Sequence, residues 1–188
     1  MLYFYRLNKF YKIPFEIEIV SDEKSLVSLS IKGQTNYSVL TKNAKEITAA
    51  TFFAAPEIVK LTTKWLDSYF SGKIPDFLPP LNYDNLTPFS RLVREEMLKI
   101  LCGKLLTYGE IAKNISKITG AKPCAQAVGQ AVGSNPISII VPCHRVIGAN
   151  GKITGYNGGI DKKIALLSLE GVLLTDEKVI YRQNFLTP

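Results

Sequence analysis

The segment Pro142-Cys143-His144-Arg145 places a thiol directly beside an imidazole. A thiol is a useful nucleophile only as a thiolate, and its ordinary pKa of about 8.5 leaves little thiolate at neutral pH. A neighbouring imidazole can take the proton, directly or through a water molecule. His144 is the single histidine of the chain, so no other imidazole could serve Cys143. These residues could therefore form a nucleophilic cysteine site, to which Arg145 adds positive potential.

Two interpretations of Cys143 stand on these residues. Adjacent side chains of an extended chain point to opposite faces, so Cys143 and His144 cooperate only if the backbone bends or a water bridges them. A proline before the pair and a glycine after it favour such a bend. In the other interpretation Cys143 is a small buried residue, as free cysteines often are. We assign that structural role to Cys102 and Cys124.

The counts of cysteine and histidine exclude several kinds of site. Three cysteines, an odd and low number, fit reduced thiols rather than a disulfide framework. No CxxC pair occurs, and residues 1–84 contain neither Cys nor His, so we expect no zinc site and no other metal. No apolar run approaches the roughly 20 residues of a membrane span, and the N-terminus lacks the pattern of a signal peptide. We therefore expect an intracellular, cytoplasmic protein without membrane contact.

The whole chain has a formal net charge of +7, and most of this positive charge lies in its second half. Residues 1–84 hold 10 Lys and Arg against 9 Asp and Glu, whereas residues 85–188 hold 13 against 7. A basic half favours a polyanionic partner. Many basic proteins bind nothing acidic, so the charge becomes informative only beside a motif.

Turn-forming residues divide the chain into two expected domains. Residues 71–88 are rich in Gly, Pro, Asn and Asp, which is typical of a linker. Strand-like patterns occur over residues 15–20, 26–32 and 37–40. Helical spacing of apolar residues follows Pro56, a residue that a first helical turn tolerates. We predict an α+β fold, with a small N-terminal strand-and-helix domain over residues 1–84 and a mainly helical domain over residues 85–188.

The second domain is predicted to contain a helix-turn-helix. Apolar residues of 89–101 lie at helical spacing, and Gly103 follows as a helix end. Thr107 and Glu110 have the pattern of a capping box, which opens a second helix. A third helix is expected over residues 123–132. Two short helices joined by a turn favour the motif.

The third helix has small residues on the face that we expect to be exposed. That face carries Gln126, Gly129, Gln130 and Gly133, and the face expected to pack inward carries Cys124, Ala127, Val128 and Ala131. A glycine in a helix costs about 1 kcal/mol relative to alanine. Close approach of the backbone to another surface explains this cost, and so does tight packing between helices.

In their order and spacing these motifs resemble the O6-alkylguanine-DNA alkyltransferases, also called methylated-DNA-protein-cysteine methyltransferases. The resemblance covers roughly residues 87–172. It rests on the segments Thr107-Tyr108-Gly109-Glu110-Ile111-Ala112, Ala127-Val128-Gly129, Asn135-Pro136, Pro142-Cys143-His144-Arg145-Val146-Ile147-Gly148, Gly155-Tyr156-Asn157-Gly158-Gly159 and Leu166-Leu167-Ser168-Leu169-Glu170-Gly171. It implies DNA repair in which Cys143 accepts the alkyl group of a flipped O6-alkylguanine, once per molecule and without a cofactor.

The resemblance also implies roles for individual residues. Cys143, His144 and Glu170 would form a relay through water, and Tyr108 would give a proton to the leaving guanine. The substrate pocket would include Asn135, Val146, Tyr156 and Asn157. Minor-groove DNA contacts would come from Ser90, Tyr108, Gly109, Ala125, Gln126, Ala127 and Gly129. Many members of the family carry an arginine where this chain has Gln126, and the N-terminal zinc ligands of some members are absent here.

The implied partner is double-stranded DNA containing O6-alkylguanine, bound by a monomer. Three alternatives compete with this function. A non-catalytic sensor of alkylated DNA is disfavoured by Cys143, since such sensors replace the reactive cysteine. A cysteine hydrolase usually takes its base from a distant position, unlike His144. A transcription factor that uses the helix-turn-helix would need an extra domain, for which we expect this chain to be too short.

Overall fold

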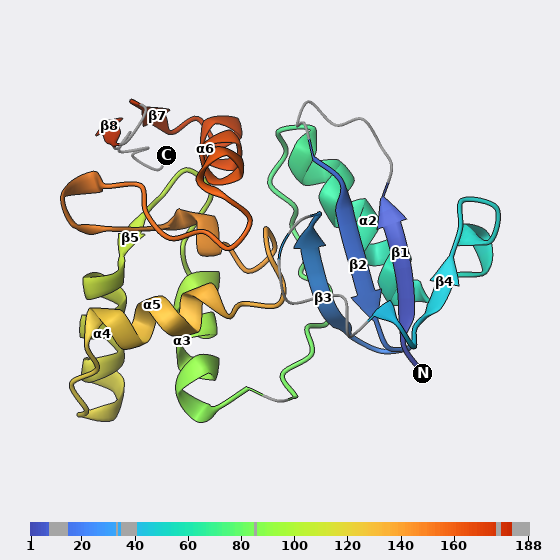
Figure 1. Ribbon diagram of the computed structural model, residues 1–188, viewed down its shortest axis with the longest axis horizontal. Coiled ribbons are helices and arrows are strands. Elements are labelled where there is room, and N and C mark those ends of the chain that lie inside the picture. The colour runs from blue at the N-terminus through green and yellow to red at the C-terminus, as the bar shows by residue number, and fades with distance from the viewer. Residues whose placement is uncertain (8–14, 33, 35–40, 85, 176–177, 182–188) are drawn as a thin grey trace. The chain divides into compact units, whose positions relative to one another are not determined.

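The alternating residues of the N-terminal half form a four-stranded sheet in the computed structural model, which describes residues 1–7, 15–32, 34, 41–84, 86–175 and 178–181 (Figure 1). The strands are β1 (Tyr3–Leu7), β2 (Ile17–Ser21), β3 (Leu26–Ile31) and β4 (Lys45–Ile47), in the order β3-β2-β1-β4. β2 is antiparallel to β1 and β3, and β4 is parallel to β1. The strands predicted over 15–20 and 26–32 are confirmed, whereas the one at 37–40 lies outside the described residues.

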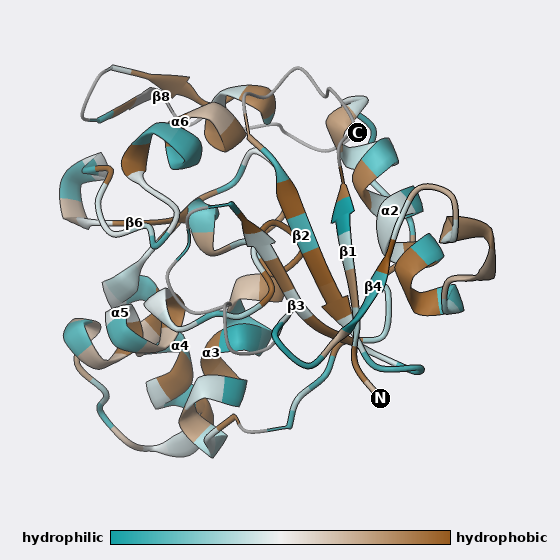
Figure 2. Ribbon diagram, turned by 45° about the vertical axis from the view of Figure 1, so that its right-hand side comes forward, coloured by the Kyte–Doolittle hydropathy of each residue, from teal (hydrophilic) through white to brown (hydrophobic). Residues whose placement is uncertain are grey.

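Helix α2 (Glu57–Phe70) packs on this sheet against β2 and β3. It follows the 3-10 helix η1 (Phe52–Ala54), and Pro56 is its N-cap. Its buried apolar residues are Ile58, Val59, Trp65, Leu66, Tyr69 and Phe70. Burying one large apolar side chain contributes about 1.5–3 kcal/mol, so this face holds the helix on the sheet. Figure 2 shows the matching hydrophobic stretches along β2.

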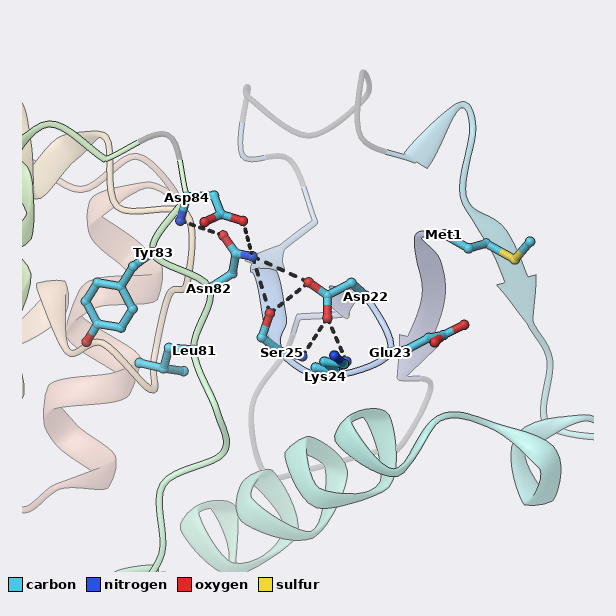
Figure 3. Close-up of a pocket in the computed structure, with 9 residues that line it drawn as sticks. All are labelled: Met1, Asp22, Glu23, Lys24, Ser25, Leu81, Asn82, Tyr83 and Asp84. Carbon is cyan, nitrogen blue, oxygen red and sulfur yellow. Dashed lines mark hydrogen bonds between the residues drawn. The ribbon is translucent and has the colours of Figure 1, made fainter.

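Part of the predicted linker pairs with β3 instead of crossing the surface unpaired. Leu26 donates its N–H to Pro80 at 2.7 Å and accepts from the N–H of Asn82 at 2.8 Å. The Asn82 side chain donates to Asp22 and Ser25, at the edge of the pocket shown in Figure 3. Burial acts to raise the pKa of Asp22, but hydrogen bonds from Lys24, Ser25 and Asn82 outweigh burial and lower that pKa.

The contacts divide the chain into two compact units that are not continuous in sequence. The first consists of Met1–Asn85 and Pro136–Ile140, and the second of Leu86–Asn135 and Val141–Pro188. The sequence placed residues 136–140 with the second domain, so the boundary differs there. The physical reason is pairing with a remote strand, because Ile137 forms a β-bridge with Leu29 of β3. Composition along the chain cannot reveal such a pairing.

The second unit is mainly helical, which confirms the predicted α+β fold. Its helices are α3 (Pro88–Leu98), α4 (Tyr108–Thr119), α5 (Ala125–Gly133) and α6 (Ile160–Leu169). Its short elements are β5 (Leu106–Thr107), η2 (Cys143–Arg145), β6 (Val146–Ile147), η3 (Ala149–Gly151), β7 (Leu173–Leu174) and β8 (Val179–Tyr181). β5 pairs in parallel with β6, and β7 pairs antiparallel with β8.

Helices α4 and α5 pack together as the predicted helix-turn-helix. The capping box of α4 is complete, since Glu110 N–H donates to Thr107 Oγ1 at 3.1 Å and Thr107 N–H donates to the Glu110 carboxylate at 2.7 Å. Gly120 ends α4 at φ 71°. None of the described helices has both the length and the apolar character that a membrane span needs.

Helix α3 ends earlier than its apolar pattern predicted. The pattern extended to Leu101, but the helix stops at Leu98 and Leu101 is exposed. The chain turns here because two main-chain groups beyond the helix form tertiary hydrogen bonds. The Ile100 carbonyl accepts from Arg145, and the Gly103 N–H donates to the carboxylate of Glu170, the C-cap of α6. Tertiary hydrogen bonds thus override the helical periodicity.

Removal of the α4 cap should destabilise the second unit. Thr107→Ala is expected to lower the free energy of unfolding by about 1 kcal/mol, because the N–H of Glu110 loses its acceptor. Urea unfolding would measure the change. Ser116→Ala in the same helix is the control and should not destabilise the protein, since alanine has the higher helix propensity. Equal destabilisation by both variants would contradict the role of the cap.

Candidate active site

Cys143 begins η2 and is buried, with 6% of its surface exposed. Its N–H donates to the carbonyl of Val141 at 2.8 Å, and the N–H of Arg145 donates to that of Pro142 at 2.9 Å. These bonds close a tight turn at Cys143. The backbone bend that cooperation between Cys143 and His144 requires is therefore present.

His144 is fully buried, and its Nε2 lies 2.8 Å from Oε1 of Glu170. Burial lowers the pKa of His144 more than Glu170 raises it, so the imidazole is neutral near pH 7. A carboxylate only accepts hydrogen bonds, so Nε2 carries the proton and Nδ1 has the lone pair. Nδ1 is buried and makes no hydrogen bond with the described residues. The ring thus presents a basic nitrogen.

Glu170 caps the C-terminus of α6 and is satisfied by donors from two other segments. Arg145 donates through Nε at 2.9 Å and Nη2 at 2.8 Å, and Gly103 N–H donates at 3.1 Å. Burial acts to raise the pKa of Glu170, but His144 and Arg145 outweigh it and hold that pKa well below its usual range. The position opposes the helix dipole, and these partners compensate for it.

Arg145 acts differently from the sequence interpretation. Its guanidinium was expected to add positive potential near the thiol. Instead it forms an ion pair with Glu170, and its Nη1 donates to the Ile100 carbonyl at 2.5 Å. Much of its charge is therefore balanced, and its main effect is to hold the carboxylate.

Tyr108, at the start of α4, reaches the loop before α6. Its hydroxyl donates to the carbonyls of Thr154 and Gly155, both at 3.3 Å. Burial, and next the charge of Cys143, raise the pKa of Tyr108, so the phenol keeps its proton. A Cβ on Gly155 would lie 2.8 Å from this hydroxyl, and Gly155 has φ 61°. Only glycine allows this approach without strain.

Lys163 is a buried cation that sequence analysis did not single out. Its Nζ donates to Val146 at 2.6 Å and to Thr154 at 2.7 Å, and burial lowers its pKa to about 8. The negative charge of a Cys143 thiolate acts to raise the pKa of Lys163, so the ammonium and the thiol interact electrostatically. The sequence offered one sign of this burial: Lys163 lies one helical turn before Leu166 and Leu167, on the same face of α6.

The remaining residues of the predicted pocket differ in their surroundings. Asn135 is buried, and its Nδ2 donates to the Val141 carbonyl at 3.1 Å. The Val146 carbonyl accepts from Lys163. Tyr156 is half-buried and Asn157 is exposed, in the loop that Tyr108 contacts. Asn135 thus supports the turn that contains Cys143, whereas the Asn157 side chain is exposed to solvent.

The N-terminal part of α5 presents small residues. Ala125 and Gln126 are exposed, and Ala127 and Gly129 are half-buried. A Cβ on Gly129 would only touch the Tyr108 ring, at 3.9 Å, so packing does not demand glycine there. Of the other predicted positions, Gly109 is exposed and Ser90 is half-buried.

Two cysteines were assigned a buried structural role, and the structure corrects both assignments. Cys124 is exposed at the N-cap of α5, where its Sγ accepts from the N–H of Ala127 at 3.4 Å. Cys102 is half-buried, and burial raises the pKa of its thiol. The inward face of α5 is formed by Val128 and Val132. No cluster of three metal-binding side chains occurs in the described part of the chain.

Comparison with known proteins identifies the family. A model of the 6-O-methylguanine DNA methyltransferase DNA-binding domain matches residues 88–172. The methylated-DNA--protein-cysteine methyltransferase of Methanosarcina acetivorans is 47% identical over 115 residues, which cover 61% of this chain and 70% of that protein. The chain belongs to the 6-O-methylguanine DNA methyltransferase family. The relative from Mycobacterium bovis is 51% identical over 105 residues, and the match spans 61% of its length.

Solved structures of the methyltransferase family extend the likeness to the first unit. O6-methylguanine methyltransferase of Mycobacterium tuberculosis has a TM-score of 0.74 at 35% identity, covering 94% of this chain and 96% of its own. The same organism's OGT, in complex with DNA, has a TM-score of 0.73 at 36% identity, covering 89% and 92%. The family fold therefore accounts for more of this chain than the sequence resemblance, which covered roughly residues 87–172.

The single histidine gives a clean test of burial at the site. Because the folded pKa of His144 is lowered, the unfolded chain binds a proton near pH 6.5 that the folded protein excludes. The free energy of unfolding should fall as the pH falls below about 6.5, by at most about 1.4 kcal/mol per pH unit. Urea unfolding at about pH 7.5 and about pH 5.5 measures this, and His144→Gln should flatten the dependence. An unchanged slope in the variant would refute the assignment.

Proposed function

We propose that this protein repairs DNA by transferring the alkyl group of O6-alkylguanine to Cys143. The observation that carries the proposal is a buried thiol followed by a neutral imidazole whose Nε2 is held by Glu170. Membership of the 6-O-methylguanine DNA methyltransferase family supports the substrate class. The proposed activity is that of a methylated-DNA--[protein]-cysteine S-methyltransferase.

The first step is activation of the thiol. The Cys143 proton passes through a water molecule to Nδ1 of His144, the ring nitrogen with the lone pair. Glu170 fixes the ring and stabilises the imidazolium that forms, like the third member of a hydrolase triad. The buried ammonium of Lys163 interacts electrostatically with Cys143, and its positive charge favours the thiolate over the thiol.

The second step is a displacement at the alkyl carbon. A carbon–sulfur bond to Cys143 forms while the carbon–O6 bond breaks, and the electron pair passes into the guanine. Tyr108 gives its proton to a ring nitrogen of the leaving base and recovers one from solvent. The raised pKa of Tyr108 keeps that proton available near neutral pH. The proton released by the thiol stays on His144 until solvent removes it.

The product makes the reaction stoichiometric. An S-alkylcysteine is a thioether, which water does not readily hydrolyse. Each molecule therefore acts once and is consumed, and the chemistry uses only side chains of the chain, without a cofactor.

The helix-turn-helix is proposed to bind the minor groove of DNA. The small residues Ala127 and Gly129 allow the backbone of α5 to approach closely, and Gln126 fills the space of the extruded base. Ser90, Gly109 and Ala125 add contacts to the strand, and Tyr108 serves both DNA and guanine. The excess of positive charge in residues 85–188 supports a polyanionic partner.

The substrate pocket is proposed to lie around the loop before α6. Tyr156 forms an aromatic wall, and the backbone N–H of Asn157 faces the guanine oxygen. The Val146 carbonyl accepts from the base with its second lone pair, beside its bond to Lys163. Asn135 ties the recognition helix to the active-site turn. Three free cysteines suit a monomer that works in the reducing cytoplasm.

Incubation with a duplex that contains O6-methylguanine should add one methyl mass to the protein. Intact-protein mass spectrometry gives the stoichiometry, and peptide mapping should place the group on Cys143. Cys102→Ala and Cys124→Ala should still accept the methyl group, whereas Cys143→Ala should not, while still binding DNA. Repeated turnover by unmodified protein, or a methyl group on another residue, would overturn the proposal.

An arginine at position 126 should strengthen DNA binding. Gln126→Arg is expected to lower the dissociation constant several-fold and to steepen its dependence on salt, since a cation near the phosphates releases counterions. Fluorescence anisotropy over a salt series measures both. Asn43→Arg adds the same charge at an exposed site of the first unit, outside the proposed DNA contacts, and is the control. Equal effects of both variants would mean that net charge, and not position 126, sets the affinity.

A further inference from the structure

The segment before the nucleophile is held by the first unit. Pro136–Ile140 belongs to that unit although α5 and η2, its neighbours in sequence, belong to the second. Leu29 of β3 donates its N–H to the Pro136 carbonyl at 3.0 Å and accepts from the N–H of Ser138 at 2.7 Å. The segment therefore extends the sheet edge by one β-bridge, between Leu29 and Ile137.

A clasp formed by the hydrogen-bonded side chains of Gln34 and Ser138 reinforces this bridge within the first unit. The Gln34 amide nitrogen donates to Ser138 Oγ at 3.2 Å, and its oxygen lies 3.3 Å from the same hydroxyl. That oxygen also accepts the N–H of Ile31 at 2.8 Å, and Gln34 N–H donates back to the Ile31 carbonyl at 3.1 Å. The glutamine is thus fixed to the end of β3 and presents its amide to Ser138, which is 1% exposed.

The held segment leads directly into the turn of Cys143. Ile139 is fully buried at φ 69°, a conformation that a β-branched residue adopts only when its surroundings impose it. On either side of the segment, Asn135 donates to the Val141 carbonyl, and that same carbonyl accepts from the N–H of Cys143. A displacement of residues 136–140 would therefore be transmitted through two covalent junctions to the nucleophile.

We propose that the first unit positions Cys143, and that Gln34 and Ser138 are positioning residues for its reaction. The inference rests on the proposed alkyl transfer. Neither residue touches the reacting atoms, since each acts through the Pro136–Ile140 segment. Loss of the clasp should leave the DNA-binding helices intact but loosen the turn that aims the thiol.

The test separates transfer from binding in full-length protein. Gln34→Ala and Ser138→Ala should each slow methyl transfer at saturating DNA by about three- to tenfold, the effect of one hydrogen bond. The dissociation constant for DNA should not change. The double variant should be no slower than the slower single variant, because Gln34→Ala already removes the bond that Ser138→Ala removes. Ser138→Thr keeps a hydroxyl and should restore most of the rate.

Ser28→Ala is the matched control on the same strand. Its hydroxyl is buried and makes no hydrogen bond with the described residues, so the transfer rate should stay unchanged. Rates are measured where urea unfolding shows every variant to be folded. Variants that lose stability but transfer at the wild-type rate would overturn the inference, and so would additive effects of the two changes. Failure of the wild-type protein to accept a methyl group would instead refute the proposed function.

Discussion

The site depends on the hydrogen bonds that satisfy the buried carboxylate of Glu170. An isolated anion in a protein interior is strongly unfavourable, so the fold must bring donors to it. His144 and Arg145 approach from η2, and the Gly103 N–H approaches from the loop after α3. One requirement, that the Glu170 carboxylate receive hydrogen bonds, therefore explains three features: the position of the end of α6, the turn at Cys143 and the early end of α3.

A buried cation imposes a second requirement on the same unit. The ammonium of Lys163 needs acceptors, and it takes them from the carbonyls of Val146, Thr154 and Gly155. These bonds fix β6 relative to the loop that Tyr108 also contacts. Hydrogen bonds to charged groups are stronger than neutral ones, so these two charges add to the apolar packing of Val141, Val146 and Ile147 in fixing the main chain around the thiol.

Two residues near the start of α5, Gln126 and Cys124, set the local properties of that helix end. Gln126 is exposed at the start of α5 and can form hydrogen bonds, but it carries no charge. Cys124 caps the same helix through its sulfur, where oxygen-bearing side chains are the preferred caps. Helix α5 thus contains no charged side chain and is capped by an uncommon residue, while the groups around Cys143 are held by many bonds.

The sequence by itself determined the elements and the nature of the chemistry. Period-two and helical patterns marked β2, β3, α2 and the capped α4, because local hydrogen bonds and one buried face set them. A lone histidine beside a cysteine predicted which residue would act as the base. Only the tertiary structure decided that Arg145 neutralises Glu170, that Lys163 is buried, and that residues 136–140 join β3. Those outcomes depend on tertiary partners, from the loop 8 residues before Lys163 to the remote strand β3, which no local pattern encodes.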